Sequence, residues 1–192
     1  MNAIISLNPD VLDNAKQLDK NREKQINHPL YGIPILIKDN IDALPMSTTA
    51  GSAAFKNNIP NDDSFLVKRI KEKGALILGK VNLSEWAYYF CQDCPLGYSA
   101  LGGQTLNPYG RKIFETGGSS SGSGVAVAAN YSVAAIGSET SGSILSPSGK
   151  NSVVGLKPTI GSISRNGIIP ISSSLDTAGP MAKSVMDTAI LM

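Results

Sequence analysis

The chain has 192 residues, of which 42% are hydrophobic and 17% are charged, and its formal net charge is +2 at pH 7. This composition is typical of a soluble globular α/β protein large enough for one sizeable core. The small net charge gives no indication of nucleic-acid binding, and the longest apolar runs are too short to cross a membrane. We therefore expect neither a nucleic-acid partner nor a membrane segment.

The two cysteines, Cys91 and Cys94, form a C-x-x-C pair without a framework of further cysteines. The first ten residues lack the basic and apolar regions of a signal peptide, so a reducing cytoplasm is the expected location. Zinc would need two more ligands, and the single histidine, His28, is distant in the sequence. No metal and no cofactor are expected, and thiol redox chemistry at the pair stays open.

The first half of the chain is expected to follow a β-α-β order. Pro9 is placed at the start of a polar helix that runs to about Lys24, and residues 1–29 are expected to form a helical arm outside the core. Alternating structure follows: a strand over residues 32–38, a helix over 62–73 and a strand over 75–80. The basic run on that helix is interspersed with acidic residues, which predicts a solvated face.

In the second half, small and apolar residues dominate the expected elements. Asn82 is expected to cap a short helix over residues 83–89, and a buried helix is expected after Gly124. Strands are expected over residues 133–137 and 151–158, and a helix begins at Ser184. We expect one domain over residues 1–192, in which residues 30–192 form the core.

A glycine- and serine-rich region and a lysine after an apolar run have the chemistry of a hydrolytic site. A serine nucleophile needs a base to take its proton and backbone N–H donors to hold the oxyanion. Small side chains in the turn at residues 140–143 leave successive amides uncovered, which is typical of an oxyanion hole. Lys38 ends an apolar run, and burial would lower its pKa enough to make it a base. His28 precedes Pro29 in a polar stretch, so a histidine base is not expected.

The glycine- and serine-rich region and the lysine each have a simpler explanation when taken alone. A glycine- and serine-rich run such as GGSSSGSG is usually a flexible loop, and a lysine after an apolar strand usually reaches water. The two occur here in order with the segments SETSGSILSP and NSVVGLKPT. This ordered co-occurrence favours a site.

Together these segments resemble the amidase signature family. Its Ser-cisSer-Lys triad consists of a lysine after an apolar strand, a serine in a GGSS run and a nucleophile in a GS-I-x-x-P context. Ser119 and Ser143 have the family's spacing of about two dozen residues. The resemblance covers roughly residues 30–192 and implies an α/β fold, a mixed β-sheet with helices on both faces.

The resemblance assigns a role to each residue of the site. Ser143 would attack the amide carbon, Ser119 would relay the proton to neutral Lys38, and a cis peptide bond would join Gly118 to Ser119. The oxyanion would be bound by backbone amides, which include those of Thr140, Ser141 and Gly142. An acyl-enzyme on Ser143 would follow, and ammonia would leave from a small-molecule or peptide carboxamide.

The chain departs from the family's commonest pattern, and the departures point to one branch. Glu139 stands in place of aspartate, Leu145 in place of arginine, and Ser121 in place of glycine. The resulting E-T-x-G-S-I variant is similar to the branch that contains peptide amidases, which act on C-terminally amidated peptides.

Two alternatives stay open. One is the family's glutamyl-tRNA amidotransferase relative, a glutaminase that works with partner subunits. The other is a catalytically inactive remnant or interaction module. Family members are typically more than twice as long as this chain. The resemblance therefore covers the part of the family's domain that carries the triad and not its later half. Self-association through exposed core residues is expected.

Overall fold

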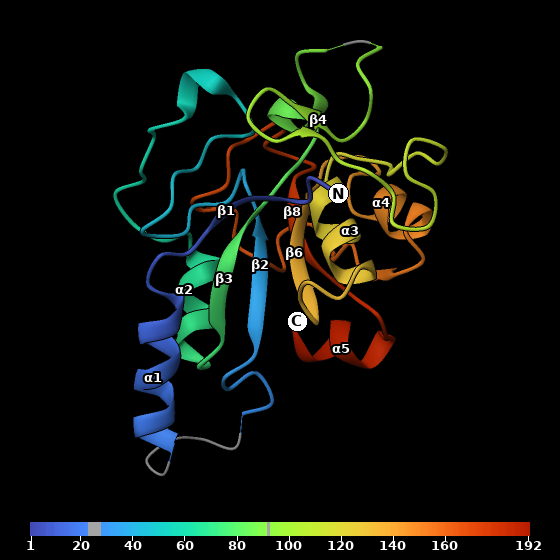
Figure 1. Ribbon diagram of the computed structural model, residues 1–192. Coiled ribbons are helices and arrows are strands. Elements are labelled where there is room, and N and C mark those ends of the chain that lie inside the picture. Colours follow the sequence, from blue (N-terminus) through green and yellow to red (C-terminus); the bar gives the residue numbers. More distant parts are fainter. Residues whose placement is uncertain (23–27, 92) are drawn as a thin grey trace.

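The computed structural model describes residues 1–22, 28–91 and 93–192. Its centre is a six-stranded sheet with the strand order β1-β3-β2-β6-β8-β7 (Figure 1). The strands are β1 (Ile4–Leu7), β2 (Pro34–Lys38), β3 (Leu76–Val81), β6 (Ala134–Glu139), β7 (Val154–Gly155) and β8 (Thr177–Ala182). β2 runs parallel to β3 and β6, whereas β1, β7 and β8 pair antiparallel. The expected mixed sheet is confirmed.

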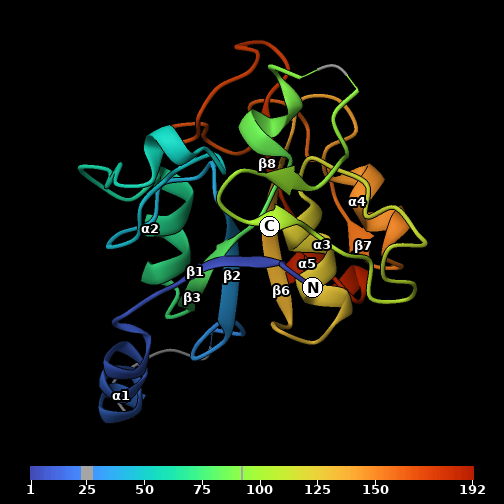
Figure 2. The ribbon, with the colours of Figure 1, turned by 45° about the horizontal axis from the view of Figure 1, so that its top comes forward.

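Helices cover both faces of this sheet. The helices are α1 (Val11–Asn21), α2 (Phe65–Glu72), α3 (Ser121–Ala128), α4 (Leu145–Lys150), α5 (Val185–Ile190) and the 3-10 turns η2 (Ala53–Phe55) and η3 (Glu85–Tyr88). Successive side chains of a strand point to opposite faces. Ile35 and Ile37 of β2 therefore pack in one cluster with α2, and Leu36 packs in another with α3. Figure 2 shows α2 and α3 on either side of the sheet.

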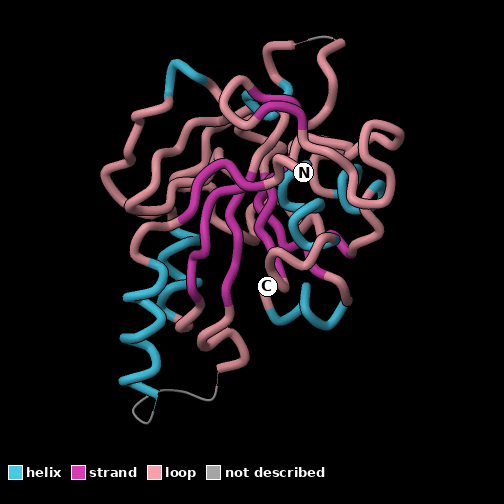
Figure 3. Tube along the Cα trace, in the orientation of Figure 1, coloured by secondary structure: helices cyan, strands magenta, loops and turns pink. Residues whose placement is uncertain are grey.

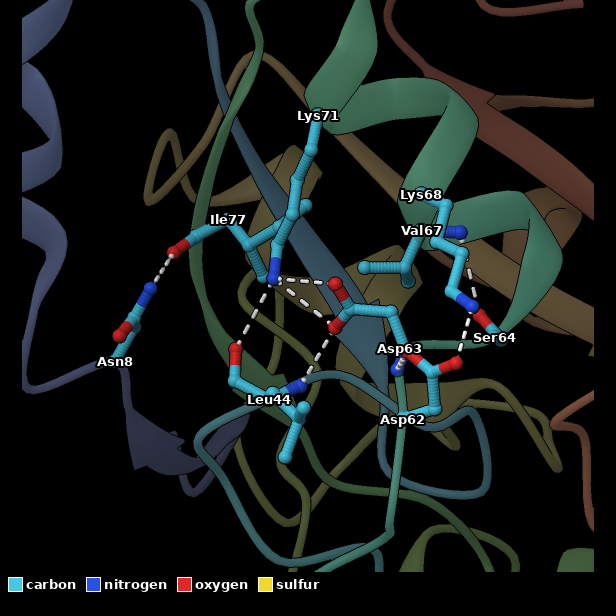
Figure 4. A network of polar contacts seen from close by, with 9 residues as sticks. All are labelled: Asn8, Leu44, Asp62, Asp63, Ser64, Val67, Lys68, Lys71 and Ile77. Carbon is cyan, nitrogen blue, oxygen red and sulfur yellow. Dashed lines mark hydrogen bonds and ion pairs between the residues drawn. The ribbon is translucent and has the colours of Figure 1, made fainter.

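The β2-α2-β3 unit confirms the expected β-α-β order, and polar contacts fix the start of its helix. Ser64 caps α2, since its hydroxyl accepts a hydrogen bond from the Val67 amide at 3.2 Å. The Lys71 ammonium donates to the Asp63 carboxylate at 2.8 Å and to the Leu44 carbonyl at 3.2 Å (Figure 4). The basic run on α2 is thus matched by acidic neighbours, as the sequence indicated.

The N-terminal segment differs from the helical arm that the sequence indicated. Residues 4–7 form β1 at one edge of the sheet, and the Asn8 side chain donates to the Ile77 carbonyl of β3 at 2.8 Å (Figure 4). α1 follows and has no buried residue, which agrees with a position outside the core. Lys24, the expected end of this helix, lies outside the described residues.

The short helix expected over residues 83–89 forms only in part, as the 3-10 turn η3, and its backbone is unusual. Trp86, Ala87 and Tyr88 have positive φ angles of 51°, 53° and 72°, in the left-handed region that side chains with a Cβ avoid. Tertiary contacts determine this turn, because the Trp86 ring packs edge-on against Phe55 and Phe90. Local propensity therefore indicates a helical turn here but not its left-handed backbone.

Three other features add to the sequence analysis. α3 begins at Ser121 and so includes the SGSG run, while α4 and β8 were not predicted. Cys91 and Cys94 form a disulfide. Among the described residues, no helix is long and apolar enough to cross a membrane, and no group of three His, Cys, Asp or Glu side chains could hold a metal ion.

Loops occupy much of the end of the sheet at which β2 and β6 terminate (Figure 3). These two strands are parallel neighbours, so their carboxyl ends meet at one edge. A short ribbon of β4 (Tyr98–Ser99) and β5 (Gly103–Gln104) lies at the same end (Figure 1). This edge carries the residues that the sequence singled out.

Candidate active site

Lys38 is the last residue of β2 and is completely buried. Its Nζ donates to Ser119 Oγ at 2.7 Å, to Ser138 Oγ at 3.0 Å and to the Ser138 carbonyl at 3.2 Å. The three preceding residues, Ile35, Leu36 and Ile37, are also fully buried. The apolar run thus carries the amine into the interior, as the sequence predicted.

Burial also changes the acidity of this amine. Desolvation lowers the pKa of Lys38 from 10.5 to about 7, although the charges of Glu139 and Asp176 act in the opposite direction. Its direct contacts are hydroxyl and carbonyl oxygens rather than a carboxylate. A large fraction of Lys38 is therefore neutral near pH 7, which is the state that can accept a proton.

Ser119 lies in the segment that leads into α3. The Gly118-Ser119 peptide bond is cis, and the Ser119 side chain is buried. The next residue joins this segment to β6, because Ser120 Oγ donates to the Ser138 carbonyl at 3.0 Å and accepts from the Ser138 amide at 3.2 Å. These contacts hold Ser119 beside the end of β2.

Ser143 is linked to the same segment through the main chain. The Ser120 amide donates to the Ser143 carbonyl at 3.1 Å, and Ser143 itself is partly exposed. Within the described part of the chain, the Ser143 hydroxyl has no hydrogen bond to Ser119. The structure therefore brings Lys38 and Ser119 into direct contact and places Ser143 next to them in the fold.

The Glu139 carboxylate organises the turn between β6 and α4. It accepts hydrogen bonds from the amides of Gly142 at 2.8 Å, Ile144 at 2.7 Å and Leu145 at 2.9 Å. The Gly142 amide is therefore occupied. Among the described hydrogen bonds, the amides of Thr140, Ser141 and Ser143 have no acceptor, so they can donate to an anionic oxygen.

One cavity opens beside this turn, and a second adjoins the first. One has a volume of about 200 Å³, and its wall includes Asn40, Ser138, Glu139 and Thr140. The other has a volume of about 190 Å³ and an aromatic wall formed by Trp86, Tyr89 and Phe90. The two share Asn40 and residues 169–171, so they adjoin each other.

The sequence analysis missed two side chains of the hydrogen-bond network around Lys38. Ser138 Oγ contacts Lys38, and the Asn40 side chain donates to that same oxygen at 3.0 Å. Ser138 belongs to the SETSGS segment and Asn40 follows Lys38 by two residues, so both signals were present. Their contact needs the pairing of β2 with β6, and no local pattern encodes it.

The fold and the buried lysine-serine pair define this chain as an amidase-class protein. A protein-family model described as Amidase matches residues 1–192, and the chain belongs to that family.

Three proteins from other organisms are similar to this chain over nearly its whole length. The chain is 56% identical to the peptide amidase from Stenotrophomonas maltophilia, with a TM-score of 0.96 over 99% of this chain and 39% of that one. It is 48% identical to a putative amidase from Schizosaccharomyces pombe, over 97% of this chain and 32% of the relative. It is 42% identical to a glutamyl-tRNA(Gln) amidotransferase component from Lawsonia intracellularis, over 100% of this chain and 38% of the relative. The chain thus spans about a third of the length of the curated relatives it matches.

Proposed function

We propose that this chain carries the catalytic centre of an amide hydrolase, with Lys38 as base, Ser119 as proton relay and Ser143 as nucleophile. The observation that supports this most directly is the Lys38 amine, which is fully buried, has a pKa near 7 and lies 2.7 Å from Ser119 Oγ. A lysine in this state is poised to exchange a proton with a serine at neutral pH.

The proposed reaction proceeds through an acyl-enzyme. Ser143 Oγ bonds to the amide carbon while its proton passes to Ser119 and the Ser119 proton passes to neutral Lys38. The C–N bond then breaks, Ser119 protonates the departing nitrogen, and Lys38 returns its proton to Ser119. Water attacks the ester on Ser143 through the same relay and regenerates the three groups.

Backbone amides would stabilise the oxyanion that forms during attack. The Thr140, Ser141 and Ser143 amides are the proposed donors, and loss of one such donor typically costs about 3–4 kcal/mol in the barrier. We assign the Gly142 amide a different part, since it already donates to Glu139. That carboxylate would fix the shape of the turn.

The preferred substrate class is a peptide or other acyl group that ends in a carboxamide. Support comes from the high identity to a peptide amidase and from the partly aromatic cavity that adjoins the one beside the β6-α4 turn. A glutaminase role within a glutamyl-tRNA amidotransferase is the second candidate, favoured by the similarity to components of those enzymes. Glutamine would be its amide substrate, and turnover would depend on a partner.

Labelling with a fluorophosphonate probe tests the nucleophile. Modification is expected at Ser143 within the tryptic peptide over residues 113–150, and it should be lost in Lys38→Ala. Ammonia release from a C-terminally amidated dipeptide, with free glutamine as the comparison, then tests the substrate class. A folded chain that is never labelled and releases no ammonia from either amide would overturn the proposal and favour an inactive module.

A further inference from the structure

Asp176, the residue before β8, joins two segments of the chain beside the candidate site. Its Oδ1 accepts a hydrogen bond from the Thr140 hydroxyl, and its Oδ2 accepts from the main-chain amides of Ile171 at 2.8 Å and Ser172 at 2.9 Å. Each carboxylate oxygen thus has its own partners. The carboxylate therefore connects the turn after β6 to the segment over residues 165–176.

The pairing of β6 with β8 determines that these two residues meet. The strands are antiparallel, and Glu139, the last residue of β6, pairs with Thr177, the first residue of β8. Thr140 and Asp176 are the next residues beyond this end of the ladder. Both line the cavity of about 200 Å³ beside the β6-α4 turn, together with Ser138. The Thr140–Asp176 hydrogen bond is thus part of the wall of the candidate site.

The segment over residues 165–176 is a fixed anchor for this hydrogen bond. Main-chain contacts attach it to the residues that follow Lys38 at the end of β2. The Ile169 amide donates to the Asn40 carbonyl at 2.9 Å, and the Asp42 amide donates to the Gly167 carbonyl at 2.8 Å. Asp176 therefore links the turn after β6 to the strand end that carries the proposed base.

The first part of the turn depends on Asp176, whereas the later part depends on Glu139. The Glu139 carboxylate binds the amides of Gly142 and of the two residues after Ser143. Among the described residues, the Thr140–Asp176 hydrogen bond is the side-chain contact that reaches Thr140 or Ser141. Because a threonine has few rotamers, fixing its hydroxyl also restricts its main chain.

We propose that Asp176 is a positioning residue, which directs the Thr140 main-chain amide toward the oxyanion by holding the Thr140 hydroxyl. The inference rests on the proposed amide-hydrolase function. Asp176 contacts no reacting atom in this role and transfers no proton. The oxyanion forms during attack and is absent from the bound amide, so the contribution belongs to kcat rather than to substrate affinity.

Thr140→Val removes the hydroxyl and keeps the shape of the side chain and the charge of Asp176. With a C-terminally amidated dipeptide, kcat should fall about tenfold and KM should stay within about twofold. The rates are compared near pH 9, where Lys38 is neutral because its pKa is about 7. Thr140→Ser restores the hydroxyl and should recover most of the loss. An unchanged kcat in Thr140→Val, or no recovery in Thr140→Ser, would overturn the proposal.

Asp176→Asn separates the hydrogen bonds from the charge. Its amide oxygen can accept from the Ile171 and Ser172 amides while its amide nitrogen donates to the Thr140 hydroxyl, so kcat near pH 9 should stay within about threefold. Burial lowers the pKa of Lys38, and the charges of Glu139 and Asp176 raise it. The acid limb of the pH profile should therefore move to lower pH in Asp176→Asn.

The same pH profile separates positioning from a disturbance of the lysine-serine relay. Thr140→Val keeps the charge of Asp176, so its acid limb should stay in place while its plateau falls. An equal shift of the limb in Thr140→Val and Asp176→Asn would show that the hydroxyl acts on Lys38, and it would overturn the proposal.

Binding of a carboxylate tests the Thr140 amide without turnover. N-acetylphenylalanine is titrated as its carboxylate into the unmodified chain, Asp176→Asn and Asp176→Ala, and the Thr140 amide is followed by NMR. Its downfield shift at saturation should fall at least twofold in Asp176→Ala and be kept in Asp176→Asn. No shift in the unmodified chain, or equal shifts in all three, would overturn the proposal. If the unmodified chain hydrolyses no amide but shows this difference, the proposed function fails while the positioning role stands.

Discussion

Two buried lysines on neighbouring strands show how surroundings decide the role of the same side chain. Lys38 ends β2 and Lys80 lies in β3, where it pairs in register with Ile37, and neither is exposed. Lys80 has a carboxylate in contact, since Asp39 Oδ1 lies 3.3 Å away. Among the described residues, the hydrogen-bond partners of the Lys38 amine are hydroxyl and carbonyl oxygens. One lysine has a carboxylate in contact, whereas the other has a pKa of about 7 and hydroxyl and carbonyl partners.

The difference teaches that two equally buried lysines can have different partners and so different roles. Desolvation lowers the pKa of both lysines, but for Lys80 the attraction and the hydrogen bond of Asp39 oppose it most directly. Asp39 is further occupied by the Thr49 hydroxyl and the amides of Thr49 and Gly51. We interpret Lys80 and Asp39 as a structural ion pair that supports the strand end on which Lys38 lies.

The largest effect is expected when Lys38 is replaced. Lys38→Met keeps the length and removes the base, so kcat/KM for an amide substrate should fall about 10³-fold or more. The folded state should be no less stable, because the buried amine that is removed has no counter-ion in contact. Amide turnover together with chemical denaturation checks both parts. Full activity in Lys38→Met would contradict the role of base.

Removing Lys80 should instead destabilise the protein. Lys80→Met leaves the Asp39 carboxylate buried without its counter-ion, and the free energy of unfolding should fall by about 3–5 kcal/mol. The double variant Lys80→Met/Asp39→Asn should recover part of this loss. Denaturant titration measures the free energy of unfolding of the unmodified chain, the single variant and the double variant. Equal stability of the single variant and the unmodified chain would show that the pair is dispensable.

The pH dependence of activity should follow the neutral form of Lys38. Because its pKa is about 7, kcat/KM should fall about tenfold for each pH unit well below that value. A profile that stays flat down to pH 5 would exclude this lysine as the titrating base.

Stability should depend on the same proton. The unfolded chain keeps Lys38 charged up to its ordinary pKa of 10.5, so between about pH 7 and 10.5 the unfolded state binds more protons and stability increases with pH. Below pH 7 both states are protonated and this contribution no longer changes. Thermal unfolding of the unmodified chain and of Lys38→Met isolates the contribution, because the variant should lack this part of the rise.

The smallest effect is expected at an exposed ion pair. Arg69 and Glu72 on α2 lie 2.7 Å apart, but their side chains are 55% and 57% exposed. Solvent screening leaves such pairs worth about 0–0.5 kcal/mol, so Arg69→Ala should hardly change the unfolding midpoint. The comparison with Lys80→Met tests whether a buried ion pair contributes more to stability than an exposed one.

Local patterns in the sequence predicted much of the fold and of the candidate site. The apolar run before Lys38, the helix capped by Ser64 and the strand after it were all recognisable because each depends on neighbours along the chain. The cis bond before Ser119 was expected from family resemblance rather than from local pattern.

What the sequence did not predict depends on distant partners. β8 contains glycine and proline and becomes a strand through its antiparallel pairing with β6. The left-handed turn at Trp86 follows from packing against Phe55 and Phe90. Likewise, Asn40 joins the site only because Ser138 lies on the adjacent strand.

The parallel pairing of β2 with β6 also has a kinetic consequence. Its register joins Ile35 to Ala134 across a long stretch of chain, and such high contact order slows folding. Until that pairing forms, Lys38 is a hydrated ammonium far from Ser119 and Ser138. A chain in which β2 and β6 have not paired would therefore lack this buried amine, and an amine that titrates near pH 7 would report that the pairing has formed.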